Sequence, residues 1–170
     1  MEKILVIPHP KLRQKSDIIK NISKKEIEIS NKMIEILKNV NGVGLAANQI
    51  GVLKQIIAVK IKKHKDDNEK IYVLFNPKIK SFSKETVIME EGCLSIPEHF
   101  AEIVRPESIE IEYTNEKNEI ISEKKEGYEA RILQHEIDHL AGKLFFDYLS
   151  SLKRNKIIKR IQKLKKLGEI

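Results

Sequence analysis

The spacing of apolar and polar residues predicts a helix in the first third of the chain. Between Ser23 and Gly42, five apolar residues follow the period of one helix face. They are Ile29, Met33, Ile36, Leu37 and Val40. Ser23 followed three residues later by Glu26 matches a capping box, in which each side chain bonds the backbone N–H of the other residue. Because Gly42 can end a helix, we predict one over residues 24–40 with its apolar stripe in the core.

Shorter apolar or alternating runs predict strands through the middle of the chain. These runs are residues 55–61, 71–76, 86–89, 109–113 and 119–125, the last returning antiparallel after a turn. Pro77 is expected to end the second strand, because proline has no N–H to donate to a neighbouring strand. The polar segment 62–70, which contains His64, is predicted to be a loop.

Two more helices are predicted in the C-terminal third. Residues 128–141 lie between Gly127 and Gly142, and apolar residues surround a polar face there. Residues 151–167 carry an apolar stripe with lysines on the opposite face. No repeat or long linker divides the chain, so we predict that residues 1–170 form a single domain.

The predicted helix at 128–141 contains a His-Glu-x-x-His sequence, formed by His135, Glu136 and His139. Residues four apart lie on one helix face, so both imidazoles can bind one metal ion. Glu136 would then lie beside them, in position to act on a water at the metal. A catalytic zinc-type site keeps three protein ligands and leaves one position for water. The pattern therefore predicts a metallohydrolase and requires a third ligand.

The third ligand has several candidates. They are the only cysteine, Cys93, the histidines His9, His64 and His99, and many carboxylates. Cys93 is the best of these candidates, because it follows a glycine in a compact, turn-like segment and a thiolate is a strong ligand for iron(II), zinc, nickel or cobalt. A free cysteine can also be a small buried hydrophobic residue. From spacing alone, both roles of Cys93 remain open.

Charge is abundant and unevenly distributed. Charged residues make up 34% of the chain, above the usual share of about 25%, and the net charge is +7. Residues 151–170 hold eight Lys or Arg and one Glu, which accounts for the whole net charge. Any basic partner-binding surface is therefore expected at the C-terminal helix. A single cysteine and the lack of an apolar run of membrane-spanning length favour a cytoplasmic protein without a membrane partner.

Three motifs resemble signatures of the peptide deformylase family, in the right order and at similar spacing. They are residues 42–49 (GVGLAANQ), 91–95 (EGCLS) and 134–139 (QHEIDH). Further similarity covers essentially the whole chain, through residues 10–13 (PKLR), 76–77 (NP) and 144–149 (LFFDYL). The resemblance implies an α+β fold, with antiparallel β-sheets packed around a central metal-binding helix and a C-terminal helix. It also implies removal of the N-formyl group from the initiator methionine of nascent polypeptides, with release of formate.

The resemblance implies roles for individual residues. One divalent metal, iron(II) physiologically and zinc, nickel or cobalt in some preparations, would be bound by Cys93, His135 and His139. Glu136 would act as general base and acid, while Gln49 and the backbone N–H of Leu94 would donate to the oxyanion.

The substrate implied by the resemblance is a formyl-methionyl peptide. The residues expected to contact it are Val43, Gly44, Met89, Tyr128 and Ile132. Glu91 and Arg105 match family positions at which a buried ion pair supports the cysteine segment. His99 and Phe100 stand where many relatives have arginine or another polar residue, so we expect a different grip on the peptide.

Two other functions share parts of this pattern. A zincin-like metallopeptidase uses the same helix but takes its third ligand downstream, and the 31 residues after His139 contain no histidine or cysteine. A basic module that binds the ribosome or other nucleic acid would use residues 151–170, which can equally be a solvated helix end. In relatives this helix can dock on the ribosome, so ribosome binding can coexist with enzyme activity. No specific DNA partner is expected.

Overall fold

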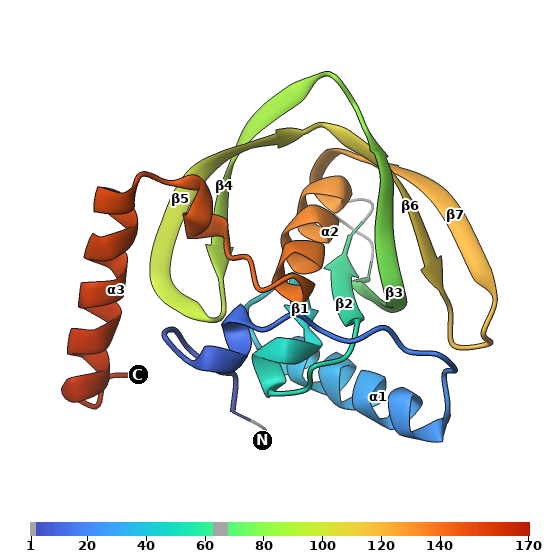
Figure 1. Cartoon of the computed structure of the whole chain (residues 1–170), viewed down its shortest axis with the longest axis horizontal. Coiled ribbons are helices and arrows are strands. Elements are labelled where there is room, and N and C mark those ends of the chain that lie inside the picture. Colours follow the sequence, from blue (N-terminus) through green and yellow to red (C-terminus); the bar gives the residue numbers. More distant parts are fainter. Residues whose placement is uncertain (1–2, 63–67) are drawn as a thin grey trace.

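Two antiparallel sheets and three α-helices make up the described part of the chain, residues 3–62 and 68–170 of the computed structural model (Figure 1). The larger sheet has the order β1-β2-β3-β6-β7. Its strands are β1 (Gly44–Ala46), β2 (Ile56–Ile61), β3 (Lys70–Phe82), β6 (Ser108–Thr114) and β7 (Ile120–Glu126). A separate hairpin joins β4 (Thr86–Cys93) to β5 (Ile96–Pro106). The predicted α+β fold class is confirmed. His64, placed in a loop by its sequence, lies outside the described residues.

Strand β2 shows how the larger sheet carries a helix on each face. Ile56 and Ala58 lie in a core that includes residues of α1 (Lys24–Asn39), whereas Ile57 and Val59 pack with α2 (Gly127–Leu140). Successive strand side chains point to opposite faces, so an unbroken apolar run is buried on both. Helix α2 consequently lies between the larger sheet and the β4–β5 hairpin (Figure 1).

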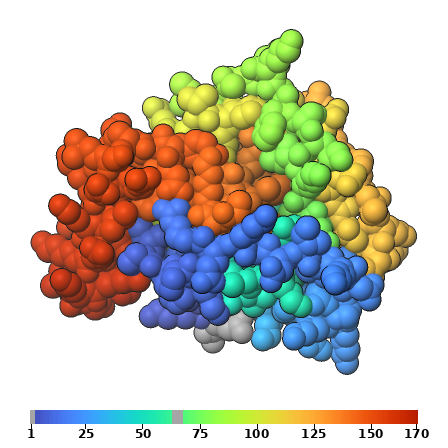
Figure 2. Space-filling view, in the orientation of Figure 1, coloured from blue at the N-terminus to red at the C-terminus, as the bar shows by residue number. Residues whose placement is uncertain are grey.

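A third core attaches the C-terminal helix α3 (Ser151–Lys166) to the rest of the molecule. Ile161 and Leu164 of α3 are buried with Phe145 and Phe146, which belong to the short helix η3 (Phe145–Tyr148). The N-terminal segment and the 3-10 helix η1 (Pro10–Arg13) complete this core. Figure 2 shows α3 along one side of the molecule, next to the N-terminal segment. Basic residues cover the outer face of α3, as the sequence predicted.

The predicted helices agree with the structure, and local signals explain the agreement. Helix α1 begins at Lys24, and both bonds of the predicted capping box between Ser23 and Glu26 are present. Helix α2 begins at Gly127, whose φ is 61°, and Gly142, with a φ of 74°, lies just beyond its end at Leu140. A backbone φ in this range favours glycine, so these two residues set the limits of the helix.

Two predictions about strands were wrong. Pro77 does not end the second strand, because β3 continues to Phe82 through a shift in register at residues 75–78. Asn76 absorbs this irregularity: its φ is 49°, and its side-chain amide exchanges two hydrogen bonds with the backbone of Ile19, at 2.7 and 2.8 Å. Strand β5 was not among the predicted strands. Only Leu94 and Ser95 form a turn, so the rest of the cysteine segment is strand.

Candidate metal centre and catalytic site

One cysteine and two histidines from two elements come together beside α2. Cys93 is the last residue of β4, and His135 and His139 lie one turn apart on α2. Their ligand atoms all lie within 4.8 Å of one another, and Cys93 Sγ is 3.3 Å from His139 Nε2. These three residues could hold one metal ion. Both histidines are buried, and Cys93 is partly exposed.

The donor set fits a borderline transition metal. A thiolate with two imidazoles suits zinc, iron(II), nickel or cobalt, whereas magnesium and calcium prefer oxygen ligands. Three protein ligands also leave a position open for water, as in catalytic sites. The other described histidines are engaged elsewhere: His9 accepts a hydrogen bond from the N–H of Lys11, and His99 Nδ1 lies 2.8 Å from the carbonyl of Pro97. Of the candidate third ligands among the described residues, Cys93 is therefore the one that the structure brings together with His135 and His139.

A buried carboxylate stands behind the first histidine. Glu91 Oε1 lies 2.8 Å from His135 Nδ1, an arrangement that directs the other ring nitrogen towards the site. Arg105 donates two hydrogen bonds to Glu91, at 2.7 and 2.9 Å, and Arg131 donates another at 2.8 Å. Burial opposes ionisation of Glu91, but the hydrogen bonds from His135 and Arg105 hold its pKa well below its usual range. The expected Glu91–Arg105 ion pair is present, within a larger cluster.

The cluster extends from Arg105 to the protein surface. Arg105 Nη1 donates to Asp138 at 2.8 Å and to the Tyr148 hydroxyl at 3.2 Å. The Tyr148 hydroxyl in turn donates to Asp138 at 2.8 Å. Since Asp138 lies next to His139 in sequence, this connection ties both ends of the histidine pair to the β4–β5 hairpin.

Glu136 is buried beside the possible metal ligands. Its Oε2 atom has no hydrogen-bond partner among the described residues. Burial raises the pKa of Glu136 to about 7. The chain leaves room for this carboxylate at Gly44, because a β-carbon added there would overlap the Glu136 side chain. Gly42 makes similar room for Leu94, whose Cδ1 would lie 2.9 Å from an added β-carbon.

The amide of Gln49 is held in one orientation by its neighbours. Its Oε1 accepts from the N–H of Ala46 at 2.8 Å, so its Nε2 must face the other way. That nitrogen donates to Ser95 Oγ at 3.0 Å and lies 3.6 Å from Cys93 Sγ. Gln49 belongs to the 3-10 helix η2 (Ala47–Ile50), and its neighbour Asn48 donates to the carbonyl of His139 at 2.6 Å. The Gln49 turn is thereby fixed to the end of α2.

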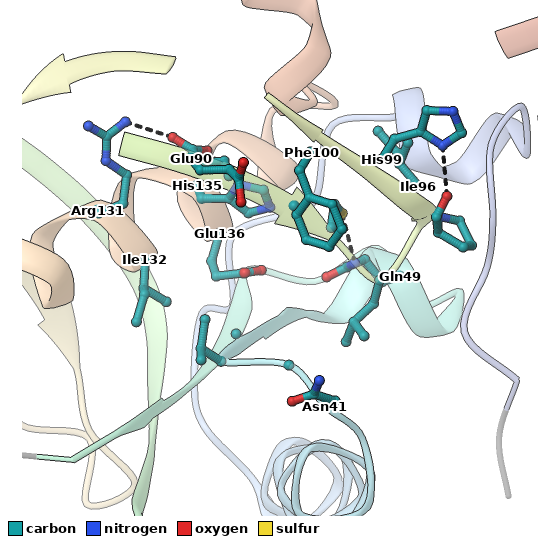
Figure 3. A pocket seen from close by; sticks show the side chains of 18 of the residues that line it. Asn41, Gln49, Glu90, Ile96, His99, Phe100, Arg131, Ile132, His135 and Glu136 are labelled. Atoms are coloured by element: carbon teal, nitrogen blue, oxygen red, sulfur yellow. Dashed lines mark hydrogen bonds and ion pairs between the residues drawn. The ribbon is translucent and has the colours of Figure 1, made fainter. Parts of the chain in front are cut away.

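A cavity of about 470 Å³ opens onto these groups (Figure 3). Cys93, His135, Glu136 and Gln49 line it, together with Leu94. Four of the residues expected to contact substrate also line the cavity, namely Val43, Gly44, Tyr128 and Ile132. Met89 is not among its lining residues, and pairs instead with Ile103 across the hairpin.

Sequence reasoning missed two polar residues of this site. Arg131 lies one turn before His135 on the same face of α2, and a charged residue at that position was an available signal. Ser95, which is fully buried and accepts the Gln49 hydrogen bond, had no distinguishing pattern. Arg131 also donates to the carbonyls of Ile103 and Val87, so it clamps α2 to both strands of the hairpin.

Three features together define a metal-dependent hydrolase. They are a histidine pair on one helix, a cysteine supplied from an upstream strand and a buried glutamate facing the same cavity. The upstream cysteine does not favour a zincin-like arrangement. Comparison with known sequences narrows the class: the family model for polypeptide deformylase matches residues 1–155. The chain belongs to this family.

Individual relatives agree with the family match. The peptide deformylase of Rhizobium meliloti is 39% identical over 166 residues, which cover 98% of this chain and 95% of the relative. That of Pelagibacter ubique is 43% identical over 167 residues, covering 97% and 95%. The crystal structure of peptide deformylase from Ehrlichia chaffeensis has a TM-score of 0.92 at 35% identity, covering 99% of this chain and 98% of that one.

Proposed function

We propose that this chain removes the N-formyl group from formyl-methionyl nascent polypeptides and releases formate. The observation that carries the proposal is the convergence of three possible metal ligands with Glu136 and Gln49 around one cavity. Relatives named peptide deformylase, 39% and 43% identical to this chain, support the same substrate class.

The metal would be held by Cys93, His135 and His139. A divalent ion there would supply Lewis acidity and make hydroxide available near neutral pH. The soft thiolate and the two imidazoles are compatible with iron(II), zinc, nickel or cobalt. Resemblance to the family favours iron(II) as the physiological ion.

Glu136 is the proposed general base and acid. It takes the proton of the attacking water and returns it to the nitrogen that leaves when the formyl C–N bond breaks. Its buried position and its unpartnered Oε2 support this role, because no hydrogen bond from the described part of the chain holds that oxygen. General acid–base catalysis of this kind typically contributes about 10²–10⁴-fold to the rate.

Gln49 and Leu94 are the proposed donors to the oxyanion. The hydrogen bond from Ala46 leaves Gln49 Nε2 facing the site, and the backbone N–H of Leu94 belongs to the turn directly after Cys93. A neutral amide donates to the developing negative charge without competing as a ligand. Loss of one such donor costs roughly 10²–10³-fold in rate.

The peptide is proposed to lie in extended form beside β1. This strand is at the edge of the larger sheet, so a further strand can pair with it. Val43, Gly44, Tyr128 and Ile132 line the adjoining cavity, and we assign the methionine side chain to that space. Met89 was expected in this wall, but it does not line the cavity and pairs with Ile103 across the hairpin.

Formate release is the test of this function. The enzyme is purified without oxygen, its metal content is determined, and formate is measured with formyl-Met peptides. We expect Glu136→Gln to retain the metal and lose at least about 100-fold in kcat. Glu28→Gln, an exposed substitution on α1, serves as the control and should match wild type. Metal-loaded wild type that releases no formate, or full activity in Glu136→Gln, would reject the mechanism.

We also propose that α3 binds the ribosome and that the enzyme works in the cytoplasm. Lys156, Lys159 and Lys163 are exposed, and no helix in the described part of the chain is long and apolar enough to cross a membrane. Deletion of residues 151–170 should weaken ribosome binding more than peptide turnover, but it would also uncover the core at Ile161. Replacing the three lysines with glutamate avoids that problem. The fraction of this variant that sediments with ribosomes should fall and should depend less on salt. Its rate of formate release from a free peptide should stay within about twofold of wild type. Unchanged ribosome binding would reject the assignment.

A further inference from the structure

Phe100 is a large aromatic residue placed at the mouth of the cavity. It lies on β5, lines the cavity, and is 66% exposed. Figure 3 shows its ring projecting from β5 over the cavity, beside Gln49. Single exposed aromatic residues are common and need no explanation. Phe82 is such a residue: it is 58% exposed on β3 and is not among the residues that line the cavity.

The ring is held against the hairpin and not left free. Phe100 pairs with Gly92 across β4 and β5, and a β-carbon at Gly92 would lie only 2.5 Å from Phe100 Cε1. The ring therefore occupies the space above the glycine. One side of the ring packs on strand β4 and the other remains open to solvent. A side chain that covers the open side gains apolar contact without having to order the ring first.

Charge around the ring adds a second preference. Glu90 and Glu98 also line the cavity and are exposed, and neither forms an ion pair within residues 3–62 and 68–170. An acidic side chain entering this mouth would meet these two carboxylates. Of the basic residues that line the cavity, Arg131 is already paired with Glu91, and His99 Nδ1 lies 2.8 Å from the carbonyl of Pro97. Exclusion of a competitor by like charge is a source of specificity that needs no contact with the preferred substrate.

We propose that Phe100 is a specificity-determining residue that favours formyl-methionyl peptides with an aromatic or branched aliphatic side chain at the second or third position. The inference rests on the proposed deformylase function, and it concerns the part of the peptide beyond the methionine. Side chains alternate along an extended peptide, so only one of these two positions should face the ring.

The test uses two peptide series, formyl-Met-X-Ala and formyl-Met-Ala-X, with X as Phe, Leu, Ser, Lys or Glu. We expect kcat/KM to be about 3–10-fold higher for Phe and Leu than for Ser in one of the series, with Glu lowest. The ratio of Phe to Ser should not change with added salt, because it reflects apolar contact. Phe100→Ser should reduce this ratio to about twofold or less, and Phe100→Trp should retain it. Phe82→Ser is the control and should keep the wild-type ratio.

Three results would overturn the inference while leaving the deformylase function intact. The first is an active wild-type enzyme that shows no preference in either series. The second is a preference that Phe100→Ser does not change. The third is a preference for Lys over both Phe and Leu that disappears at high salt, which would assign selectivity to the carboxylates. Failure of the wild-type enzyme to release formate from any peptide in the panel would instead reject the proposed function.

Discussion

Replacing Glu91 with glutamine should weaken both the fold and the metal site. Glu91 is 5% exposed, and its carboxylate contacts His135 and the guanidinium groups of Arg105 and Arg131. Glutamine keeps the size of the side chain but removes its charge. Arg105, which is 3% exposed, would then keep only the carboxylate of Asp138. Arg131, also 3% exposed, would lose the one carboxylate that it contacts among the described residues.

The size of the effect follows from these contacts. Removing one partner of a buried ion pair typically costs about 3–5 kcal/mol, because the other charge stays buried without compensation. Glutamine can still accept part of the hydrogen bonding, so we expect the free energy of unfolding to fall by about 2–4 kcal/mol. That is a large share of the roughly 5–15 kcal/mol that stabilises a domain. Metal affinity should fall about 10–100-fold, because His135 loses the carboxylate that orients its ring.

Two measurements separate these effects. Urea denaturation of the chelator-treated enzyme gives the free energy of unfolding, and competition with a chromophoric chelator gives the affinity for zinc. Glu90→Gln is the matched control. The Glu90 side chain, next to Glu91 in the sequence, is exposed, so this substitution should change the free energy of unfolding by less than about 0.5 kcal/mol. A Glu91→Gln enzyme as stable as this control would refute the argument from buried charge. Unchanged zinc affinity would refute the connection from Glu91 to His135.

Two further substitutions test the site and the fold. Gly44→Ala places a methyl group on the Glu136 carboxylate, so formate release should fall at least about tenfold while the circular dichroism spectrum stays unchanged. Hydrogen bonds from Lys54 and Ser23 hold the pKa of Glu26 at about 2, so its stabilisation is complete above about pH 4.5 and is lost as the pH falls towards 2. Urea denaturation of Glu26→Gln should therefore show a loss of about 1–3 kcal/mol at pH 7 that disappears near pH 2, whereas Glu28→Gln behaves as wild type throughout. A pH-independent loss in Glu26→Gln would contradict the assigned pKa.

Features set by neighbouring residues could be predicted from the sequence. The limits of α1 depend on the capping box and on helical spacing, and both signals lie within about twenty residues. The His135–Glu136–His139 group could be predicted for the same reason, because one helix places all three side chains. Cys93 was different: its chemistry made it the best candidate for the third ligand, but spacing alone left its role open until the family resemblance favoured it as a ligand.

Features set by distant residues could not be predicted. Strand β3 passes Pro77 because Asn76 is held in a left-handed conformation by Ile19, a residue 57 positions earlier. Strand propensity, which depends on local sequence, predicts that a strand ends at proline. It does not take into account the distant contact between Asn76 and Ile19. The partners of Arg131 could not be predicted for a similar reason, since they lie on two strands between 28 and 44 residues away.

The EGCLS motif has a geometric explanation that its letters alone do not give. Strand side chains alternate, so Glu91 and Cys93 point to the same side of β4, towards α2, and Gly92 points outward beneath Phe100. Two residues of strand advance about 6.6 Å, and four residues of helix advance about 6.0 Å. The step from Glu91 to Cys93 therefore matches the step from His135 to His139, and each strand residue meets its own histidine. Inserting one residue between Glu91 and Cys93 would turn one of them to the outer face. The positions of Cys93, a proposed metal ligand, and of Glu91, which supports the proposed ligand His135, therefore depend on a single register.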